Sequence, residues 1–301
     1  MDSLLWGIDL GGTKIEIALC DPAKPAEALL RRRCDTAAHL GYDQILARIS
    51  SLVAEAEEIS GRRRPTRIGI GTPGAVDPST GELKNSNTTC LNGRPLRQNL
   101  AEILGCEITM ANDANCFTLA EALWGAGKGE DLVLGLILGT GVGGAVLLDG
   151  HLFTGHRGAA AEPGLIGIDP EGPPCNSGNR GSLESFCSRR GFDRLSSVEP
   201  AELCRRADAG DAEALAVWQA YGRLLGLGVS SLLYVFTPER VLIGGGLSAA
   251  SHHFLPAAQA ELEQRVQAES RAGLQLRRAA LGNGAGRLGA ARLALDRLLN
   301  V

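Results

Sequence analysis

The sequence lacks several features that would place it in other classes of protein. Its 301 residues carry 30 basic and 34 acidic side chains, a net charge of −4, so no basic excess points to nucleic acid. No apolar stretch reaches the length of a transmembrane helix. The chain starts MDSLLWGIDLGG and enters a strand-like run at once, so we expect no signal peptide and a cytoplasmic location.

The cysteines also lack a metal or redox pattern. There are eight, and no two of them form a C-x-x-C pair. In a chain of this length without a signal peptide, such scattered residues indicate reduced thiols. Hydrophobic residues make up 44% and charged residues 21%, an ordinary composition, and the length suffices for two domains.

Two familiar phosphate-binding motifs are missing as well. There is no Walker A loop, and no Gly-rich turn opens a helix after the first strand as a dinucleotide-binding fold requires. Instead, the turn Gly11-Gly12-Thr13 joins two strand-like runs, 4–10 and 14–20. Glycine lets backbone N–H groups approach phosphate oxygens closely, and Thr13 and Lys14 add a hydroxyl and a positive charge.

A second Gly-rich turn repeats this arrangement about 130 residues later. The strand-like runs 132–139 and 144–149 flank a cluster whose candidate phosphate-binding residues are Gly139, Thr140, Gly141 and Gly143. The repetition predicts two similar α/β domains with a cleft between them, each presenting a hairpin to a triphosphate. Either cluster alone could equally be a tight β-turn.

A third cluster, Gly244-Gly245-Gly246, follows the apolar run 239–243. A Gly-rich strand-to-helix turn allows a flat adenine to lie against the backbone. A plain turn between strand and helix explains the same residues equally well.

Carboxylates occur where two strands are expected to end. Asp9 precedes the first Gly-rich turn and could hold Mg²⁺ through water. Asn112 and Asp113 close a predicted strand at 107–110 and open a predicted helix at 113–125. Asp113 could accept a proton from a substrate hydroxyl, and Asn112 could hydrogen-bond other hydroxyls. The simpler explanation of Asp113 is a helix N-cap.

Amides and hydroxyls of the kind that recognise polyols gather in two segments. One is the turn that ends at Gly74, and the other is 84–93, which contains Asn87. Each residue taken alone is a common turn former. Glu162 and Glu184 flank a loop at 157–185 that is rich in Gly, Pro and Asn, where a lone Glu is usually solvated.

Helical or strand-like patterns cover most of the remaining chain. Apolar spacing predicts helices at 43–59, 95–104, 211–235, 254–270 and 285–299, and strands at 66–71 and 273–278.

Taken together, these motifs resemble the ROK family (repressors, open reading frames, kinases) over essentially the whole chain. They are Asp9-x-Gly-Gly-Thr13, Thr72-Pro-Gly74, Asn112-Asp-Ala-Asn115, Leu138-Gly-Thr-Gly-Val-Gly-Gly144 and Gly244-Gly-Gly246. The block 84–93 is similar to that of fructokinases and manno(fructo)kinases. The run 135–144 also resembles bacterial N-acetylglucosamine kinases.

The resemblance implies a hexose kinase with the two-domain actin-like ATPase fold of the hexokinase superfamily. The expected domains are 1–112 and 113–285, with the C-terminal helix 286–301 packing back on the first. Asp113 would be the general base that deprotonates the sugar 6-hydroxyl, which attacks the γ-phosphate of Mg-ATP. Residues expected to hold the sugar are Gly74, Asn87, Asn112, Asp113, Glu162 and Glu184.

One departure from the family pattern is large. Family members usually bind zinc through one His and three Cys, but here those positions hold Leu165, Cys175, Ser177 and Ser182. Leu and neutral Ser cannot replace imidazole and thiolates in a tetrahedral site, so we expect no structural zinc. The family His is also expected to touch the sugar, so Leu165 changes one substrate contact.

Three alternatives stay open at this point. The first is an N-acetylglucosamine or N-acetylmannosamine kinase, and the second is a sugar sensor without catalysis. The third, a ROK repressor, would carry a helix-turn-helix module before the first glycine hairpin, and here that hairpin starts near residue 7. A homodimer or higher homo-oligomer is expected. The preferred hexose (fructose, glucose or mannose) and the donor, ATP or polyphosphate, are not distinguished.

Overall fold

The computed structural model describes residues 4–25, 27–156, 160–175 and 177–295. The chain forms two compact α/β units, which are described separately below. Unit 1 comprises Met1–Trp124, Thr154–Ala160 and Leu281–Val301, and unit 2 comprises Gly125–Phe153 and Ala161–Ala280. These units are defined by internal packing, and the domain division after residue 112 stays a prediction.

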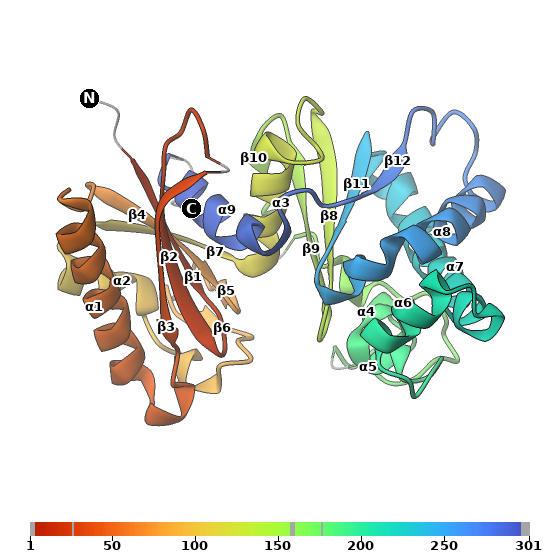
Figure 1. Ribbon diagram of the computed structural model, residues 1–301, viewed down its shortest axis with the longest axis horizontal. Helices are drawn as coiled ribbons and strands as arrows, with labels where there is room; N and C mark the ends of the chain where they lie inside the picture. The colour runs from red at the N-terminus through yellow and green to blue at the C-terminus, as the bar shows by residue number, and fades with distance from the viewer. Residues whose placement is uncertain (1–3, 26, 157–159, 176, 296–301) are drawn as a thin grey trace. The chain divides into compact units, whose positions relative to one another are not determined.

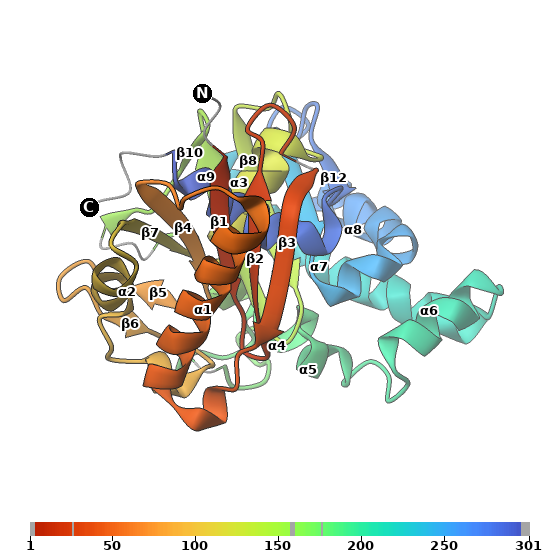
Figure 2. The same cartoon turned by 60° about the vertical axis from the view of Figure 1, so that its left-hand side comes forward.

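Unit 1 is built on a five-stranded sheet in the order β3-β2-β1-β4-β7. β2 pairs antiparallel with both β1 and β3, whereas β1–β4 and β4–β7 are parallel. Figure 2 shows the long strands β1, β2 and β3 side by side. The strands are β1 (Leu5–Leu10), β2 (Lys14–Cys20), β3 (Ala28–Asp35), β4 (Arg67–Thr72) and β7 (Glu107–Asn112).

Helices cover both faces of this sheet, with α1 and α2 on one side and α9 on the other (Figure 1). In α1 the predicted apolar spacing is buried, and Gly61 ends the helix in a left-handed conformation. A Cβ on Gly7 or Gly69 would collide with the α9 backbone, so these glycines let α9 lie directly on β1 and β4. The helices are α1 (Tyr42–Ser60), α2 (Leu96–Leu104), α3 (Asp113–Trp124) and α9 (Ala285–Leu293).

Unit 2 repeats the same sheet topology in the order β10-β9-β8-β11-β12. The β8–β9 and β9–β10 pairs are antiparallel, and β8–β11 and β11–β12 are parallel. The predicted internal repetition is therefore confirmed at the level of strand order and direction. The strands are β8 (Leu132–Leu138), β9 (Val142–Leu148), β10 (His151–Leu152), β11 (Arg240–Gly244) and β12 (Gln275–Arg278).

The core of unit 2 lies between this sheet and its helices. Trp218 and Tyr221 of α7 and Phe254 of α8 form a buried aromatic cluster with ring centroids 5.1–5.9 Å apart. The helices are α4 (Leu183–Cys187), α5 (Arg189–Phe192), α6 (Pro200–Asp208), α7 (Ala212–Phe236) and α8 (Ser251–Arg265). No helix among the described residues is long and apolar enough to cross a membrane.

Short elements complete the connections. They are the two-residue strands β5 (Ala75–Val76) and β6 (Leu83–Lys84), and the 3₁₀ turns η1 (Ala38–Leu40), η2 (Thr89–Leu91), η4 (Pro163–Leu165), η5 (Gly246–Ala250) and η6 (Gly282–Gly284).

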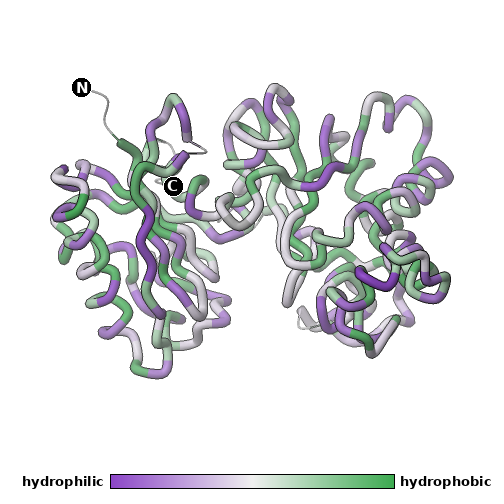
Figure 3. Tube along the Cα trace, in the orientation of Figure 1, coloured by the Kyte–Doolittle hydropathy of each residue, from purple (hydrophilic) through white to green (hydrophobic). Residues whose placement is uncertain are grey.

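Sequence patterning missed the short elements β5, β6, β10, α4, α5 and α6 and one long strand, β3. It is an edge strand whose residues alternate between half-buried and exposed, and its arginines give it the hydrophilic colour visible in Figure 3. Two predicted helices have different limits. The helix predicted at 254–270 starts at Ser251 and ends at Arg265, and the helix predicted at 285–299 ends at Leu293, while 296–301 lie outside the described residues.

Candidate active site

The polar residues of unit 1 gather at one edge of its sheet. Asp9 of β1 is paired with Gly71 of β4, and Thr72 is paired with Asn112 of β7. These three neighbouring strands are parallel, so their carboxyl ends meet at the same edge. Open α/β sheets bind ligands at this edge, so its side chains are the candidates for chemistry.

Asp9 lies in an unfavourable place for a negative charge. Burial above all, and then the charges of Asp113 and Glu16, raise its pKa from an ordinary 3.8 to about 6. The cations Lys14 and Arg287 oppose this effect but do not cancel it. A divalent cation would offset the repulsion between these carboxylates, so the electrostatics fit the oxygen-ligand site that Mg²⁺ prefers.

The residue that caps α3 is Asn112 and not Asp113, which was the simpler explanation of that carboxylate. The Asn112 side chain accepts a hydrogen bond from the Asn115 N–H at 2.7 Å, which is the geometry of a helix cap. Asp113 is the first helical residue, and one of its carboxylate oxygens accepts from the Ala114 N–H at 2.8 Å. Explaining Asp113 as the cap residue is therefore wrong, because Asn112 occupies that position.

The Asp113 side chain is exposed to solvent. Desolvation by the surrounding protein nevertheless raises the pKa of its carboxyl group. The hydrogen bond from the Ala114 N–H acts in the opposite direction and does not cancel the rise. A recessed carboxylate with a raised pKa is suited to accept a proton, since general bases work best with a pKa nearer the working pH.

The first Gly-rich turn is held by the segment that follows β3. The Gly11 N–H donates to the Lys14 carbonyl at 2.9 Å, which closes the hairpin. The hydroxyl and N–H of Thr36 donate to the carbonyls of Gly11 and Thr13 at 2.6 and 2.9 Å. Gly12, Thr13 and Lys14 are exposed, so their backbone and side chains are open to a ligand.

The predicted polyol-binding block folds against this hairpin. Ser86 and Asn92 bond each other twice, and this pairing turns the chain so that Asn87 is exposed. A Cβ on Gly12 would lie 3.5 Å from the hydroxyl of Thr88, so the block and the hairpin are neighbours. Gly74 packs so closely on this block that its Cβ would be 2.6 Å from the Lys84 carbonyl. Because it has no side chain, Gly74 lets the turn after β4 pack closely against the block 84–93.

The second Gly-rich turn, between β8 and β9, is supported by a side chain from α4. One oxygen of Glu184 accepts a hydrogen bond from the Val142 N–H at 2.9 Å. The Arg189 N–H donates to the Gly139 carbonyl at 2.7 Å. A Cβ on Gly141 would lie 2.5 Å from the same Glu184 oxygen, so Gly141 gives that carboxylate its place. Thr140 lies in the turn, and Gly143 lies within β9.

The third glycine cluster lies beside this turn in unit 2. Gly244 ends β11 opposite Ile137 of β8, and Gly245 follows with φ of 83°. A Cβ on Gly245 would collide with the backbone of Leu138, so both its conformation and its packing require glycine. Gly245 and Gly246 are exposed and lie at the same edge as the Gly-rich hairpin.

Glu162 lies on the long polar loop of unit 2, together with the positions compared above with the family's zinc ligands. Glu162 is exposed and precedes the η4 turn, in which Leu165 is 38% exposed. Cys175 remains close to two of the replaced positions. Burial raises its pKa, but hydrogen bonds from Ser177 and Ser182 outweigh this and lower it from the ordinary value. Ser182 also caps α4, and Asn176 lies outside the described residues.

Sequence reasoning missed two supporting contacts. The bond from Glu184 to the hairpin connects residues 42 positions apart, and the bonds from Thr36 come from the end of the unrecognised strand β3. A third missed feature is Glu16, which is 3% exposed and forms ion pairs with Arg31 and Arg287 at 2.8 and 2.9 Å. No local pattern signals any of these long-range pairs.

The repeated sheets, each with a Gly-rich hairpin beside its parallel strands, define the fold as that of the actin-like ATPases. A sequence profile of the ROK family matches residues 5–297, and the chain belongs to this family. The glucokinase of Thermotoga maritima is 35% identical over 82% of this chain and 83% of its own length. The N-acetyl-D-glucosamine kinase of Salmonella paratyphi B is 33% identical over 88% of this chain and 94% of its own.

A solved structure extends the comparison to bound ligands. The ROK glucokinase of Streptomyces griseus, in complex with glucose and AMPPNP, superposes with a TM-score of 0.79 and 28% identity. The match covers 97% of this chain and 99% of that one.

Proposed function

We propose that this ROK-family sugar kinase transfers the γ-phosphate of ATP to the 6-hydroxyl of an unmodified hexose. The observation that carries the proposal is the pair Asp9 and Asp113 at the carboxyl ends of β1 and β7, the two parallel strands on either side of β4, with a raised pKa for each. One carboxylate serves the metal and the other serves the hydroxyl. The glucokinase relative and the solved complex with glucose and AMPPNP support a hexose and an adenine nucleotide as the substrates.

In this proposal Asp113 removes the proton from the sugar 6-hydroxyl. The oxygen attacks the γ-phosphorus in line, the bond from that phosphorus to the β-bridging oxygen breaks, and ADP leaves. Asp9 holds the waters of Mg²⁺, which when bound neutralises charge on the phosphates. The two glycine turns form the surfaces that contact the phosphates: Gly11, Gly12, Thr13 and Lys14 in unit 1, and Gly139, Thr140, Gly141 and Gly143 in unit 2. The N–H groups of Gly11 and Gly139 close the two hairpins.

The remaining assignments are proposed from residue chemistry. Gly244, Gly245 and Gly246 form the surface on which the adenine lies. Asn87, Asn112 and Glu162 hold sugar hydroxyls, and Gly74 keeps the polyol-binding block in place. Glu184 contributes one oxygen to the sugar while the other stays on the Val142 N–H.

The second candidate is phosphorylation of an N-acetylhexosamine, favoured by the N-acetyl-D-glucosamine kinase relative at 33% identity. A coupled ADP-release assay with glucose, fructose, mannose, N-acetylglucosamine and N-acetylmannosamine separates the two. We expect kcat/KM to be highest for a plain hexose. A higher value for either N-acetyl sugar would reverse the ranking, and sugar binding without ADP release would identify a sensor.

Further expectations concern the assembly, the donor and the metal of the long loop. We propose a homo-oligomer, which sedimentation measurements test. We also propose ATP rather than polyphosphate as donor, which an assay of the sugar phosphate formed from each donor tests. We also propose that the loop around Cys175 functions without zinc, because serine hydroxyls occupy two of its former ligand positions.

A further inference from the structure

Outside the candidate active site, four metal-ligating side chains of unit 2 converge on one point. They are Cys204, Asp208, His252 and His253, and their ligand atoms all lie within 4.8 Å of one another. The Nε2 atoms of both histidines lie 2.8–2.9 Å from the same oxygen of Asp208. The Cys204 sulfur lies 3.9 Å from the other oxygen of Asp208.

The four residues come from two helices, in two closely spaced pairs. Cys204 and Asp208 are four residues apart on α6, so they share one helix face. His252 and His253 lie in the first turn of α8. Two residues from each helix give the cluster the ligand count of a closed tetrahedral site.

Packing fixes the backbone that carries both ligand pairs, whereas the side chains of His252 and Asp208 are 54% and 52% exposed. Leu203 and Ala207, the neighbours of Cys204 and Asp208, are 2% and 4% exposed and belong to the core of unit 2. On α8, Phe254 next to the histidines is fully buried in the aromatic cluster. The cluster therefore lies on a rigid frame, as a designed metal site requires.

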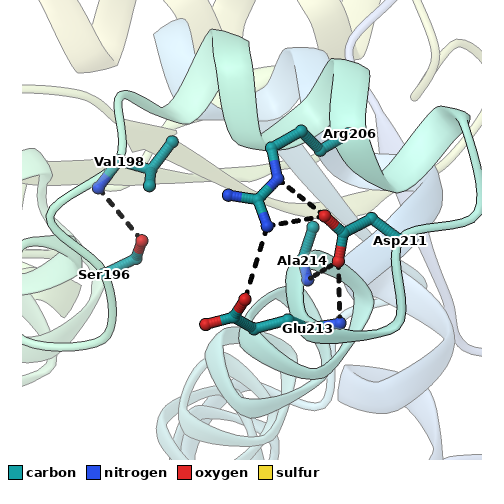
Figure 4. A network of polar contacts seen from close by, with 6 residues as sticks. All are labelled: Ser196, Val198, Arg206, Asp211, Glu213 and Ala214. Carbon is teal, nitrogen blue, oxygen red and sulfur yellow. Dashed lines mark hydrogen bonds and ion pairs between the residues drawn. The ribbon is translucent and has the colours of Figure 1, made fainter.

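A polar network also holds the end of α6. Figure 4 shows Arg206 of α6 bonded to Asp211, which caps α7 through the N–H groups of Glu213 and Ala214. Arg206 also reaches Glu213 at 3.4 Å. Asp208 lies between Arg206 and Asp211 in sequence, so this network limits the movement of the backbone that carries it.

We propose that Cys204, Asp208, His252 and His253 form a binding site for a first-row divalent transition metal, with Zn²⁺ as the best match. A thiolate, a carboxylate and two imidazoles are the donor types that Zn²⁺ takes. Ligands at about 2.0–2.3 Å from a tetrahedral ion lie roughly 3.3–3.8 Å from one another. Small rotations of the side chains would bring the four atoms from their present separations to these values.

The surroundings of the four side chains would let a metal ion enter and leave. A pocket of about 490 Å³ lined by both histidines opens beside the cluster and offers an entry path. The site joins α6 to the start of α8, the helix that follows the glycines 244–246 and the η5 turn. It is separate in sequence from the loop at 165–182, so metal at α6 and α8 is compatible with a loop that holds none.

The test is a titration of metal-free, untagged protein with Co²⁺ and then Zn²⁺ against a chromophoric chelator. We expect one equivalent of Co²⁺ with the intense visible bands of a tetrahedral site and a thiolate-to-cobalt charge-transfer band. We expect Zn²⁺ to displace it and to raise Tm. Cys204→Ser should abolish the charge-transfer band, and His253→Ala should weaken Zn²⁺ binding at least tenfold.

Cys175→Ser is the matched control and should leave the bands, the affinity and the rise in Tm unchanged. Circular dichroism of each variant without metal shows whether it is folded, and Asp208→Asn provides an independent variant if another fails to fold. The absence of a tetrahedral cobalt spectrum in folded wild-type protein would overturn the proposal. So would a spectrum that survives Cys204→Ser with His253→Ala, or one that disappears with Cys175→Ser.

Discussion

The two Gly-rich hairpins look alike in sequence and are supported in different ways. In unit 1 the turn after β1 is held by main-chain bonds and the hydroxyl of Thr36, and a Cβ on Gly12 would meet only ordinary contact. In unit 2 the turn after β8 is held by the carboxylate of Glu184, and a Cβ on Gly141 has no room. A glycine motif thus predicts where a phosphate loop lies, but not which residue shapes it.

The units differ even more in their carboxylates. Unit 1 places Asp9 and Asp113 at one sheet edge, each with a raised pKa, while at the corresponding hairpin of unit 2 the Glu184 carboxylate accepts a main-chain hydrogen bond. This difference supports the proposal that unit 1 carries out the proton transfer and holds the metal, while unit 2 binds the nucleotide and part of the sugar.

The largest effect is expected at Asp113. Because a positioned base contributes ~10²–10⁴-fold to rate, Asp113→Asn should lower kcat by about that factor. Asparagine keeps a side-chain oxygen that can accept from the Ala114 N–H, so folding and sugar binding should survive. Steady-state kinetics together with sugar-induced tryptophan fluorescence check both parts. Near-normal turnover in the folded variant would remove Asp113 from catalysis.

Asp9 should show opposite effects on activity and stability. Its pKa of about 6 means that Mg²⁺-dependent activity falls as pH drops through that value, because the protonated acid cannot hold the metal's waters. The folded state binds this proton more tightly than the unfolded chain, whose pKa is near 3.8, so ionised Asp9 destabilises the fold as pH rises from about 4 to 6.

Asp9→Asn removes that penalty, so the variant should be nearly inactive yet more stable above pH 6, by up to ~3 kcal/mol at ~1.4 kcal/mol per pKa unit. Urea denaturation of both proteins at pH 4 and pH 7.5 measures the difference, which should shrink at the lower pH. Equal stability at both values would show that Asp9 is not destabilised by its surroundings.

Alanine substitutions at Gly141 and Gly12 test whether the two Gly-rich hairpins are supported in different ways. Gly141→Ala displaces the Glu184 oxygen from the Val142 N–H, so it should cost about 1 kcal/mol of stability, the worth of one hydrogen bond, while raising the KM for ATP. Gly12→Ala meets only Thr88 at an ordinary distance, so stability should change little. Thermal melts and ATP titrations of both variants test this contrast.

A double mutant then shows whether Glu184 is the cause. Adding Glu184→Ala to Gly141→Ala should cost much less stability than the two single changes added together, because the crowding disappears. Simple additivity would mean that the carboxylate does not occupy the place it has in this structure.

The smallest effect is expected at the loop around Cys175, for which we propose function without zinc. Cys175→Ser should leave kcat and KM unchanged, since hydrogen bonds among Cys175, Ser177 and Ser182 already hold the loop. Activity should also persist after a strong zinc chelator when Mg²⁺ is supplied in excess. A loss that only zinc restores, present in Cys204→Ser but absent in Cys175→Ser, would place a functional zinc in the loop.

Local patterns predicted most of the fold. The apolar runs that became β1, β2, β8 and β11, and the spacing that became α1 and α7, are strong because each element buries a continuous face. The strand β3 was missed because its arginines follow an exposed edge, where burial leaves little trace in sequence. The helix predicted at 254–270 already included Pro256, and its pattern located α8 without fixing the ends at Ser251 and Arg265.

The sequence predicted the residue types of the candidate active site, but not the long-range contacts that hold them. Glycine turns and strand-end carboxylates can be recognised locally, and the family pattern orders them along the chain. The support of Gly141 by Glu184 and the cluster of Cys204 with His252 and His253 depend on tertiary packing between distant segments. Such pairs have no local signature, so only the structure brings them together.

The central claim is that a sugar 6-hydroxyl receives phosphate from ATP with the help of Asp113. Its most direct test is ³¹P NMR of the products formed from ATP, Mg²⁺ and glucose, alongside the same reaction with 6-deoxyglucose and with Asp113→Asn. The account predicts a hexose 6-phosphate and ADP in equal amounts from glucose, and neither from the deoxy sugar or the variant on the same time scale. Inorganic phosphate without a sugar phosphate, a phosphate on another hydroxyl, or equal product from Asp113→Asn would contradict it.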